Sequence, residues 1–300
     1  MPDWSKFEQI ISDAIGRSFL LKQNAAVSGG DINQAFRVEG VFADNNEAAQ
    51  YFIKLNQQSR LAMFEAEAAG LEQIDQSKTI RVPKVICHGV EGSQSFLVLE
   101  NLSLSHGLGV DTAKRFGQQL VAMHRVTAPQ FGWQRNNTIG STQQNNNLTD
   151  SWIDFWREQR LGFQLDLAKS HGCGRSLYTK GEKLKSQLEQ FFLSYNPEPS
   201  LLHGDLWSGN YSYLSSGEPV IYDPAVYYGD RETDLAMTEL FGGFPSEFYM
   251  AYNEAWPIDE GYKQRKALYN LYHILNHFNL FGGGYAVQAE SMLDNLLDGI

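Results

Sequence analysis

Stretches of β-branched and aromatic residues, separated by polar turns, recur through the first hundred residues and predict β-strands. Residues 60–76 instead combine Ala, Leu, Met, Glu and Gln with one Gly and no Pro, a composition typical of a helix. Another amphipathic helix is expected near the start, because apolar residues from Trp4 to Ile15 fall at helical spacing. The strands are expected at about 18–27, 34–42, 49–55, 84–90 and 93–100.

The pattern changes after Glu100, where helical periodicity takes over. Only short strands are expected in this part, at about 201–203, 211–214 and 219–222. We therefore predict an α+β protein with a bilobal arrangement: a small β-rich N-lobe at 1–101 and a larger helical C-lobe at 102–300. The helices of the C-lobe are expected at 111–128, 151–170, 175–195, 259–281 and 285–298.

Composition narrows the class of protein. The 300 residues are 42% hydrophobic and 20% charged, which is close to a globular average and argues against disorder. The formal net charge of −11 argues against broad nucleic-acid binding, which needs a basic surface. No apolar run reaches the roughly 20 residues of a membrane span, and the first residues do not resemble a secretory signal. With only Cys87 and Cys173, one disulfide is possible, but two free thiols in the cytoplasm are the simpler expectation.

The strongest chemical signal lies in the segment LLHGDLWSGNYSYLSSGEPVIYDPA, residues 201–225. Asp205 is followed five positions later by Asn210, and Asp223 comes directly after the apolar stretch of a short predicted strand. One carboxylate and one amide oxygen form an oxygen-only site that suits Mg²⁺. The remaining carboxylate, Asp205, would then orient the acceptor hydroxyl, as in kinase-type phosphoryl transfer.

The first half of the chain supplies groups that such a site would need. Lys54 lies among apolar residues on a predicted strand and could reach nucleotide phosphates, although a strand lysine often faces solvent instead. Glu67 is preferred over Glu65 as its partner, because Glu67 lies beside the apolar face of the predicted helix. The turn containing Gly29 and Gly30 could bring backbone N–H groups to phosphate, or it could be a plain hairpin turn.

Several longer motifs resemble the fructosamine kinase family, also called ketosamine-3-kinases, almost from end to end. They are HGDLWSGN, YDPAVYYGDRETDLAM, VSGGDIN, MFEAEAAGL and NNTIGSTQQNN. HGD…N alone is shared with aminoglycoside and choline kinases, whereas the Trp-Ser-Gly insert and the YYGDRETDLAM run point to fructosamine kinases. The resemblance implies a protein-kinase-like bilobal fold, ATP as donor with Mg²⁺, and phosphorylation of the 3-hydroxyl of a ketosamine in deglycation.

The resemblance also assigns roles by position. Asp205 matches the catalytic base, Asn210 and Asp223 match the magnesium ligands, and Lys54 and Glu67 match the phosphate-binding lysine and its partner. An interlobe hinge whose backbone receives adenine is matched by Glu100, Asn101 and Leu102. Asp223-Pro224-Ala225 stands where protein kinases have Asp-Phe-Gly, so control through a moving Phe or an activation loop is not expected.

Supporting roles are expected for three more residues. His203 could fix the catalytic loop by donating to a carbonyl or to Asp223, and Asp234 matches a position that supports the loop. Trp207 could stack on the sugar or amine part of the substrate, or it could anchor the loop as a core residue. His124 is expected to be a hydrogen-bonded core histidine, and His273 and His277 are expected to be packing residues rather than zinc ligands.

Three questions stay open at the level of sequence. The Asn/Gln-rich segment 134–147 could be a plain linker or a substrate-side loop. The acceptor could instead be an aminoglycoside, choline, homoserine or a thiosugar on the same fold. A nucleotide-binding pseudokinase is the alternative from another class, although an intact set of Lys54, Asp205, Asn210 and Asp223 disfavours it.

Overall fold

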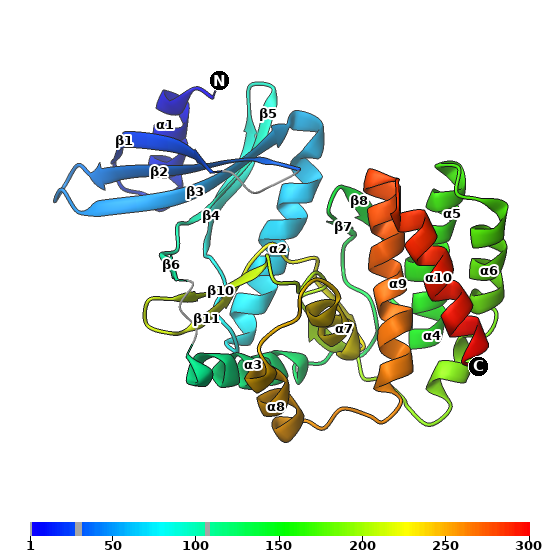
Figure 1. The fold of residues 1–300 in the computed structure, drawn as a ribbon. Coiled ribbons are helices and arrows are strands. Elements are labelled where there is room, and N and C mark those ends of the chain that lie inside the picture. Colours follow the sequence, from blue (N-terminus) through cyan, green and yellow to red (C-terminus); the bar gives the residue numbers. More distant parts are fainter. Residues whose placement is uncertain (1, 28–31, 106–108) are drawn as a thin grey trace.

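The N-terminal part of the computed structural model is a five-stranded antiparallel sheet (Figure 1). The structure describes residues 2–27, 32–105 and 109–300, so the expected Gly29-Gly30 turn lies outside the described residues. The strand order is β1-β2-β3-β5-β4, which puts β3 in the centre. The strands are β1 (Phe19–Val27), β2 (Gln34–Phe42), β3 (Ala48–Gln57), β4 (Val85–Glu91) and β5 (Gln94–Glu100).

Two helices flank this sheet. Helix α1 (Trp4–Ile15) buries Phe7 and Ile11 in an apolar cluster with residues of the sheet, and Asp3 caps its first turn. Helix α2 (Leu61–Ser77) buries Phe64, Leu71 and other apolar residues in a second, larger cluster that it shares with the C-terminal region. Because α2 contributes to that cluster, it connects the sheet to the rest of the molecule.

The C-terminal region is mainly helical (Figure 1). Its helices are α3 (Val110–His124), α4 (Trp152–Phe155), α5 (Phe163–Ser170), α6 (Arg175–Lys185), α7 (Glu232–Leu240), α8 (Ser246–Ala255), α9 (Tyr262–Phe281) and α10 (Tyr285–Asp298). Short antiparallel ladders link β6 to β10 to β11, β9 to β12, and β7 to β8. These strands are β6 (Leu104–Ser105), β7 (Asn137–Ile139), β8 (Thr142–Gln144), β9 (Ser200–Leu202), β10 (Tyr211–Leu214), β11 (Pro219–Ile221) and β12 (Tyr227–Gly229).

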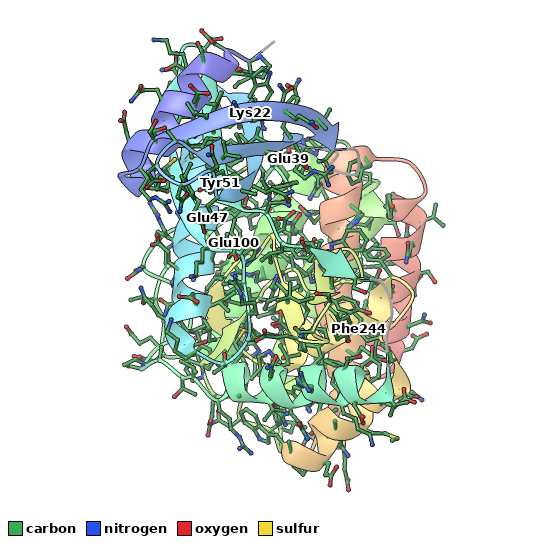
Figure 2. The ribbon with its side chains drawn as sticks, turned by 90° about the vertical axis from the view of Figure 1, so that its left-hand side faces the viewer. Lys22, Glu39, Glu47, Tyr51, Glu100 and Phe244 are labelled. Atoms are coloured by element: carbon green, nitrogen blue, oxygen red, sulfur yellow. The ribbon has the colours of Figure 1, made fainter. Side chains whose placement is uncertain are left out.

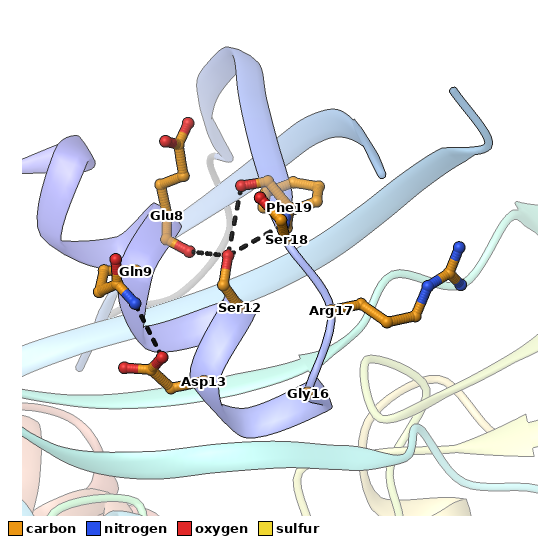
Figure 3. Close-up of a pocket in the computed structure, with 8 residues that line it drawn as sticks. All are labelled: Glu8, Gln9, Ser12, Asp13, Gly16, Arg17, Ser18 and Phe19. Carbon is orange, nitrogen blue, oxygen red and sulfur yellow. Dashed lines mark hydrogen bonds between the residues drawn. The ribbon is translucent and has the colours of Figure 1, made fainter. Parts of the chain in front are cut away.

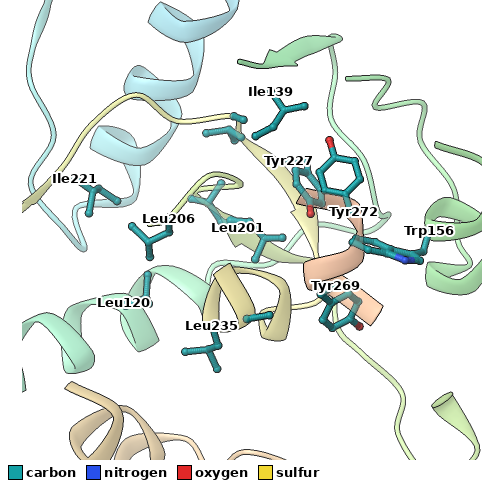
Figure 4. Close-up of a cluster of buried hydrophobic side chains, with 14 of the residues drawn as sticks. Leu120, Ile139, Trp156, Leu201, Leu206, Ile221, Tyr227, Leu235, Tyr269 and Tyr272 are labelled. Atoms are coloured by element: carbon teal, nitrogen blue, oxygen red, sulfur yellow. The ribbon is translucent and has the colours of Figure 1, made fainter. Parts of the chain in front are cut away.

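One apolar core supports the loops between these short strands (Figure 4). Leu206, which follows Asp205, is fully buried together with Leu120 of α3 and Leu235 of α7. Ile139 of β7 and Tyr272 of α9 belong to the same cluster. Burial of each such side chain contributes on the order of 2 kcal/mol, so this core fixes the loops in place.

The sequence prediction is correct for the sheet and wrong in several details of the helical region. The predicted helix 175–195 ends at Lys185, where Lys183 and Lys185 meet the negative end of the helix dipole, and only a 3₁₀ turn follows. The predicted helix 151–170 contains a π-helical segment, Trp156–Gly162, in which Arg160 is fully buried against aromatic rings. Segment 134–147 forms the β7–β8 hairpin, and α8 was not predicted.

Within the described residues, no helix combines the length and apolarity needed to cross a bilayer.

Candidate active site

Lys54 points inward from the central strand of the sheet. Its side chain is 6% exposed, and its Nζ donates to Glu67 Oε1 at 2.6 Å and to Asp223 Oδ1 at 2.5 Å. Burial alone would lower the pKa of Lys54, but the charges of Asp223 and Glu67 raise that pKa above its ordinary value. The ammonium is therefore charged at neutral pH and joins the sheet, α2 and the loop after β11 at one point.

The contact expected for Glu67 is present, and the competing glutamate faces elsewhere. Glu65 lies 3.9 Å from the guanidinium of Arg135, away from Lys54. Positions two residues apart are separated by about 200° around a helix, so the two carboxylates point to opposite sides of α2. The apolar neighbours of Glu67 on α2 thus identified the correct face.

The loop after β9 carries Asp205 in a buried position. Burial first, and then the nearby charge of Asp223, raise the pKa of Asp205 to about 7, while the hydrogen bond from Asn210 opposes the shift. The Asn210 amide donates to the Asp205 carbonyl at 2.8 Å and to Asp205 Oδ2 at 3.1 Å. A carboxylate of this kind resembles those that enzymes use to orient or accept a proton.

Asp234 of α7 accepts hydrogen bonds from the backbone of this loop. Its two oxygens accept the backbone N–H groups of His203, at 2.7 Å, and Gly204, at 2.8 Å. His124 Nε2 lies 3.2 Å from Asp234 Oδ2, and His124 Nδ1 lies 2.7 Å from the Tyr252 hydroxyl. Burial would raise the pKa of Asp234, but His124 and these N–H donors lower it. His124 is thus a hydrogen-bonded core histidine, as predicted.

His203 joins the loop to the segment that carries Asp223. Its Nε2 lies 3.0 Å from the carbonyl oxygen of Tyr222, and its own carbonyl accepts the N–H of Ala225 at 2.8 Å. Burial lowers the pKa of His203, so the ring is neutral and donates through Nε2. A Cβ at Gly204, where φ is +82°, would lie 2.1 Å from the Ala225 carbonyl oxygen, so only glycine permits this approach.

The donor chemistry of Asn210 and Asp223 fits a hard divalent cation. Because the Asn210 NH₂ group is bonded to Asp205, its Oδ1 is left free of hydrogen bonds within the described part of the chain. The Asp223 side chain uses one oxygen for Lys54 and is 46% exposed. An amide oxygen and a partly exposed carboxylate are typical Mg²⁺ ligands when phosphates and water complete the shell. His273 is fully enclosed, and burial lowers its pKa to about 3, as expected for a packing residue.

The predicted hinge lies at the end of β5. The Glu100 carboxylate pairs with Arg81 and accepts the Lys84 N–H at 3.1 Å, so the side chain is already occupied. The N–H of Glu100 donates to the carbonyl of Lys84, just before β4, and the N–H of Asn101 donates to the carbonyl of Gln50 in β3. Among the described residues, the Leu102 N–H meets no acceptor, which leaves it available to a ligand.

Trp207 is 37% exposed, so the interpretation as a core anchor is wrong. Its ring lies over the backbone of Gly209 and meets the ring of Phe241 edge-on, with centroids 6.3 Å apart. Phe281, at the end of α9, is 56% exposed. Both aromatic groups lie on the surface rather than in the core.

Two groups of residues near the site were missed by sequence reasoning. Asn137 and Gln144 donate to the carbonyls of Val226 and Ala225, just after Asp223. Tyr252 and Arg231 extend the hydrogen bonds of His124, because the Arg231 guanidinium donates to the Tyr252 hydroxyl at 3.2 Å. The only available signal was the density of amide residues in 134–147, since no local pattern encodes such distant partners.

A hollow of about 440 Å³ lies between α1 and β1 (Figure 3). It is lined by residues such as Glu8, Ser12 and Arg17, and it contains none of the candidate site residues. The Arg17 guanidinium pairs with Asp44 and Glu47, so its charge is already balanced.

Figure 2 shows the same sheet from another side, with Glu100 below Tyr51 and Lys22.

The fold described above is kinase-like. A choline kinase structure from Streptococcus pneumoniae shares this fold with a TM-score of 0.62 at 14% identity, covering 98% of this chain and 100% of that one. A solved structure from Haemophilus somnus, provisionally named a fructosamine-3-kinase, superimposes with a TM-score of 0.87 at 29% identity, covering 98% and 97%.

The chain belongs to the fructosamine kinase family, whose model matches residues 3–299. A Synechocystis protein named Probable ketoamine kinase is 50% identical over 98% of this chain and 97% of its own length. An Arabidopsis thaliana protein with the name "Protein-ribulosamine 3-kinase, chloroplastic" is 40% identical over 94% of this chain and 85% of its own length. The predicted family, fold class and enzyme class are therefore confirmed, and membership of a kinase family implies the use of ATP.

Proposed function

We propose that this protein transfers the γ-phosphoryl group of ATP to the 3-hydroxyl of a ketosamine, with Mg²⁺, and so acts in deglycation. One observation carries the proposal: Lys54 Nζ is shared between Glu67 and Asp223, which brings the two halves of the chain together beside Asp205. Family membership supplies the acceptor class, since full-length relatives are named ketoamine and ribulosamine kinases.

We assign the nucleotide to the junction between an N-lobe of residues 1–101 and a C-lobe of residues 102–300. Lys54 would bind the phosphates, and the Gly29-Gly30 turn would cover them. Adenine would contact the backbone of Glu100, Asn101 and Leu102, and the assignment is supported by the Leu102 N–H, which has no acceptor among the described residues. Two free thiols, Cys87 and Cys173, suit a reducing compartment such as the cytoplasm.

Asp205 would orient the acceptor hydroxyl and accept its proton as the new O–P bond forms. Asn210 and Asp223 would hold Mg²⁺, which when bound neutralises charge on the phosphoryl oxygens. His203 and Asp234 would keep the loop in place without touching substrate. Most of the rate enhancement would come from orientation and from charges that are already in position.

The acceptor would lie against a row of aromatic rings beside Asp205. From Trp207 the row continues through Phe241 to His277, with 5.0 Å between the last two centroids. His277 also contacts the rings of Phe281 and Tyr285, at 5.7 and 5.2 Å. Partly exposed rings of this kind can stack on the C–H faces of a sugar and attract an amine. This row supports a substrate contact for Trp207.

An acceptor screen tests the proposal. Purified protein, ATP and Mg²⁺ should phosphorylate ribulosyl-lysine or fructosyl-lysine at the 3-hydroxyl, with product position read by NMR, while aminoglycosides, choline and homoserine stay unmodified. Asp205→Ala should abolish turnover and retain ATP binding in calorimetry. Phosphorylation of another acceptor class alone would support the alternative kinases, and ATP binding without any turnover would support a pseudokinase.

A further inference from the structure

The β7–β8 hairpin buries an unusual number of amide side chains. Asn137, Gln144 and Asn146 are 7%, 1% and 0% exposed, and all three lie in the polar segment 134–147. A buried amide without hydrogen-bond partners costs on the order of 1–3 kcal/mol, so each of these groups needs specific partners. The partners are distant in sequence and close to the candidate active site.

Two of the amides bond to the segment that follows Asp223. Asn137 Nδ2 donates to the carbonyl oxygen of Val226 at 2.8 Å, and Gln144 Nε2 donates to the carbonyl oxygen of Ala225 at 3.1 Å. The N–H of Ala225 already donates to His203 in the catalytic loop. The backbone at 225–226 is therefore attached on one side to the loop of Asp205 and on the other side to the hairpin.

The amide groups also hold one another in a single orientation. Asn137 Oδ1 accepts from Gln144 Nε2 at 2.8 Å and from Asn146 Nδ2 at 3.0 Å. Gln144 Oε1 accepts from the Tyr272 hydroxyl at 2.7 Å, and Asn146 Oδ1 accepts from the buried guanidinium of Arg160 at 2.7 Å. Turning any one amide over would place donors against donors, so the network allows only this arrangement.

The hairpin also reaches the helix that carries Glu67. Arg135, just before β7, donates to the backbone carbonyl of Glu65 in α2 at 2.9 Å. At the tip of the hairpin, Gly140 leaves so little room that an added Cβ would meet Ile32 and Leu280 side chains at 3.2 and 3.1 Å. The hairpin thus contacts α2, the end of the β1–β2 turn, α9 and the segment after Asp223.

That segment is short and under conformational constraint. Helix α7 begins at Glu232, so only residues 224–231 separate it from Asp223. Asp223 itself has φ of +59°, a left-handed conformation that is uncommon for residues other than glycine, although aspartate adopts it more readily than most. In kinases with long activation loops, phosphorylation orders the equivalent segment through added charge.

We propose that Asn137 and Gln144 are positioning residues that hold Asp223 in its ligand-binding geometry, so that the site is assembled without phosphorylation or a partner. This inference rests on the proposed function for its link to catalysis, but its structural content is independent of the acceptor. In regulated kinases, the charge of an added phosphate orders this segment; in this chain, the hairpin amides order it.

The test uses the full-length protein with Asn137→Leu and Gln144→Met, which remove the donors at similar volume. Hydrogen–deuterium exchange of residues 222–229 should accelerate by about 10-fold in both variants. The Kd for a non-hydrolysable ATP analogue with Mg²⁺ should rise and kcat should fall, each by about 10-fold, while the acceptor KM stays within about twofold. Asn279→Leu is the matched control, because within the described part of the chain its amide donates only to Gln164 on α5.

Tyr272→Phe is a milder variant in case the amide variants do not fold, since it removes one donor to Gln144. It should show the same changes in exchange and in Kd at about threefold. The inference is overturned if folded variants keep wild-type exchange at 222–229, or if Asn279→Leu shows equal losses at equal thermal stability. A wild-type protein that phosphorylates no ketosamine would refute the proposed function, whereas exchange and nucleotide binding would still test the hairpin.

Discussion

The N-terminal sheet and the C-terminal loops both bury charged groups, but they balance those charges in different ways. In the sheet, the Lys54 ammonium is balanced by two carboxylates, Glu67 and Asp223, one of which is partly exposed. In the C-terminal region, the Asp234 carboxylate is balanced by backbone N–H groups and by His124. The pKa of Lys54 is raised and that of Asp234 is lowered, so both groups are kept charged.

The difference is that Lys54 can exchange one of its partners, whereas Asp234 cannot. A nucleotide phosphate could take the place of Asp223 on Lys54, because both are anionic oxygens and the carboxylate can turn toward a cation. The N–H groups of His203 and Gly204 have no such alternative, since breaking those bonds would leave a buried carboxylate unpaired. We therefore expect loss of a sheet-side group to lower activity more than stability, and loss of a group on the far side of the loop to lower both.

The largest effect is expected for Lys54→Met. Removal of one charged donor from the phosphate site should lower kcat by about 10²–10³-fold, with a smaller effect on melting temperature that comes from the Glu67 carboxylate left buried without its partner. Steady-state kinetics and a thermal melt measure the two quantities. Lys22→Met is the control, because Lys22 is an exposed lysine on β1. Loss of folding in parallel with activity in Lys54→Met would contradict the proposed contrast.

Asp234→Asn should combine two losses. Asp234 uses both carboxylate oxygens as hydrogen-bond acceptors, whereas asparagine offers only one. The free energy of unfolding should therefore fall by about 3 kcal/mol, and kcat should fall with it. Urea denaturation at 25 °C gives the first quantity, and turnover per folded molecule gives the second. Asp298→Asn, at an exposed position of α10, should change neither. Wild-type stability in Asp234→Asn would show that the loop is held by other contacts.

Trp207→Ala should affect the acceptor alone. Loss of one stacking partner should raise the acceptor KM by about 5- to 10-fold and leave the ATP KM and the melting temperature unchanged. Trp207→Phe should restore most of the affinity, because it retains an aromatic face. Unchanged acceptor kinetics in a folded Trp207→Ala protein would remove the proposed substrate contact.

The smallest effect concerns acid stability of the helical region. Burial lowers the pKa of His273 to about 3, so below the ordinary histidine pKa of about 6.5 the unfolded chain binds a proton that the folded chain does not. Stability therefore falls as pH falls. Between pH 6.5 and 5.5 the wild type should lose about 1 kcal/mol more than His273→Gln, measured by urea denaturation. His171→Gln, at an exposed position, should follow the wild type, and equal slopes for all three proteins would contradict the assignment.

Sequence patterns predicted the contact between Lys54 and Glu67 on the sheet side. Lys54 lies on a strand whose apolar neighbours are evident, and the choice of Glu67 over Glu65 needed only the helical angle between them. The segment with Asp205, Asn210 and Asp223 was identified by spacing. Such features depend on neighbours within one or two turns, which a sequence displays directly.

The helical region was harder to predict because its important contacts join distant residues. Gln144 and Ala225 are 81 positions apart, and Asn137 and Val226 are 89 apart. The polarity of segment 134–147 suggested a loop, yet its amides are buried and saturated by distant carbonyls. A polar residue is compatible with solvent or with a buried partner, and only the fold distinguishes the two.

The sequence alone determined which groups could perform the chemistry and which local elements carry them, because residue type and periodicity are local properties. The tertiary structure decided how firmly each group is held and which surfaces stay exposed: Trp207 lies at the surface, and the backbone just after Asp223 accepts hydrogen bonds from a hairpin about 80 residues earlier in the chain. Long-range hydrogen bonds form only after the core has brought the segments together, and no local pattern specifies them.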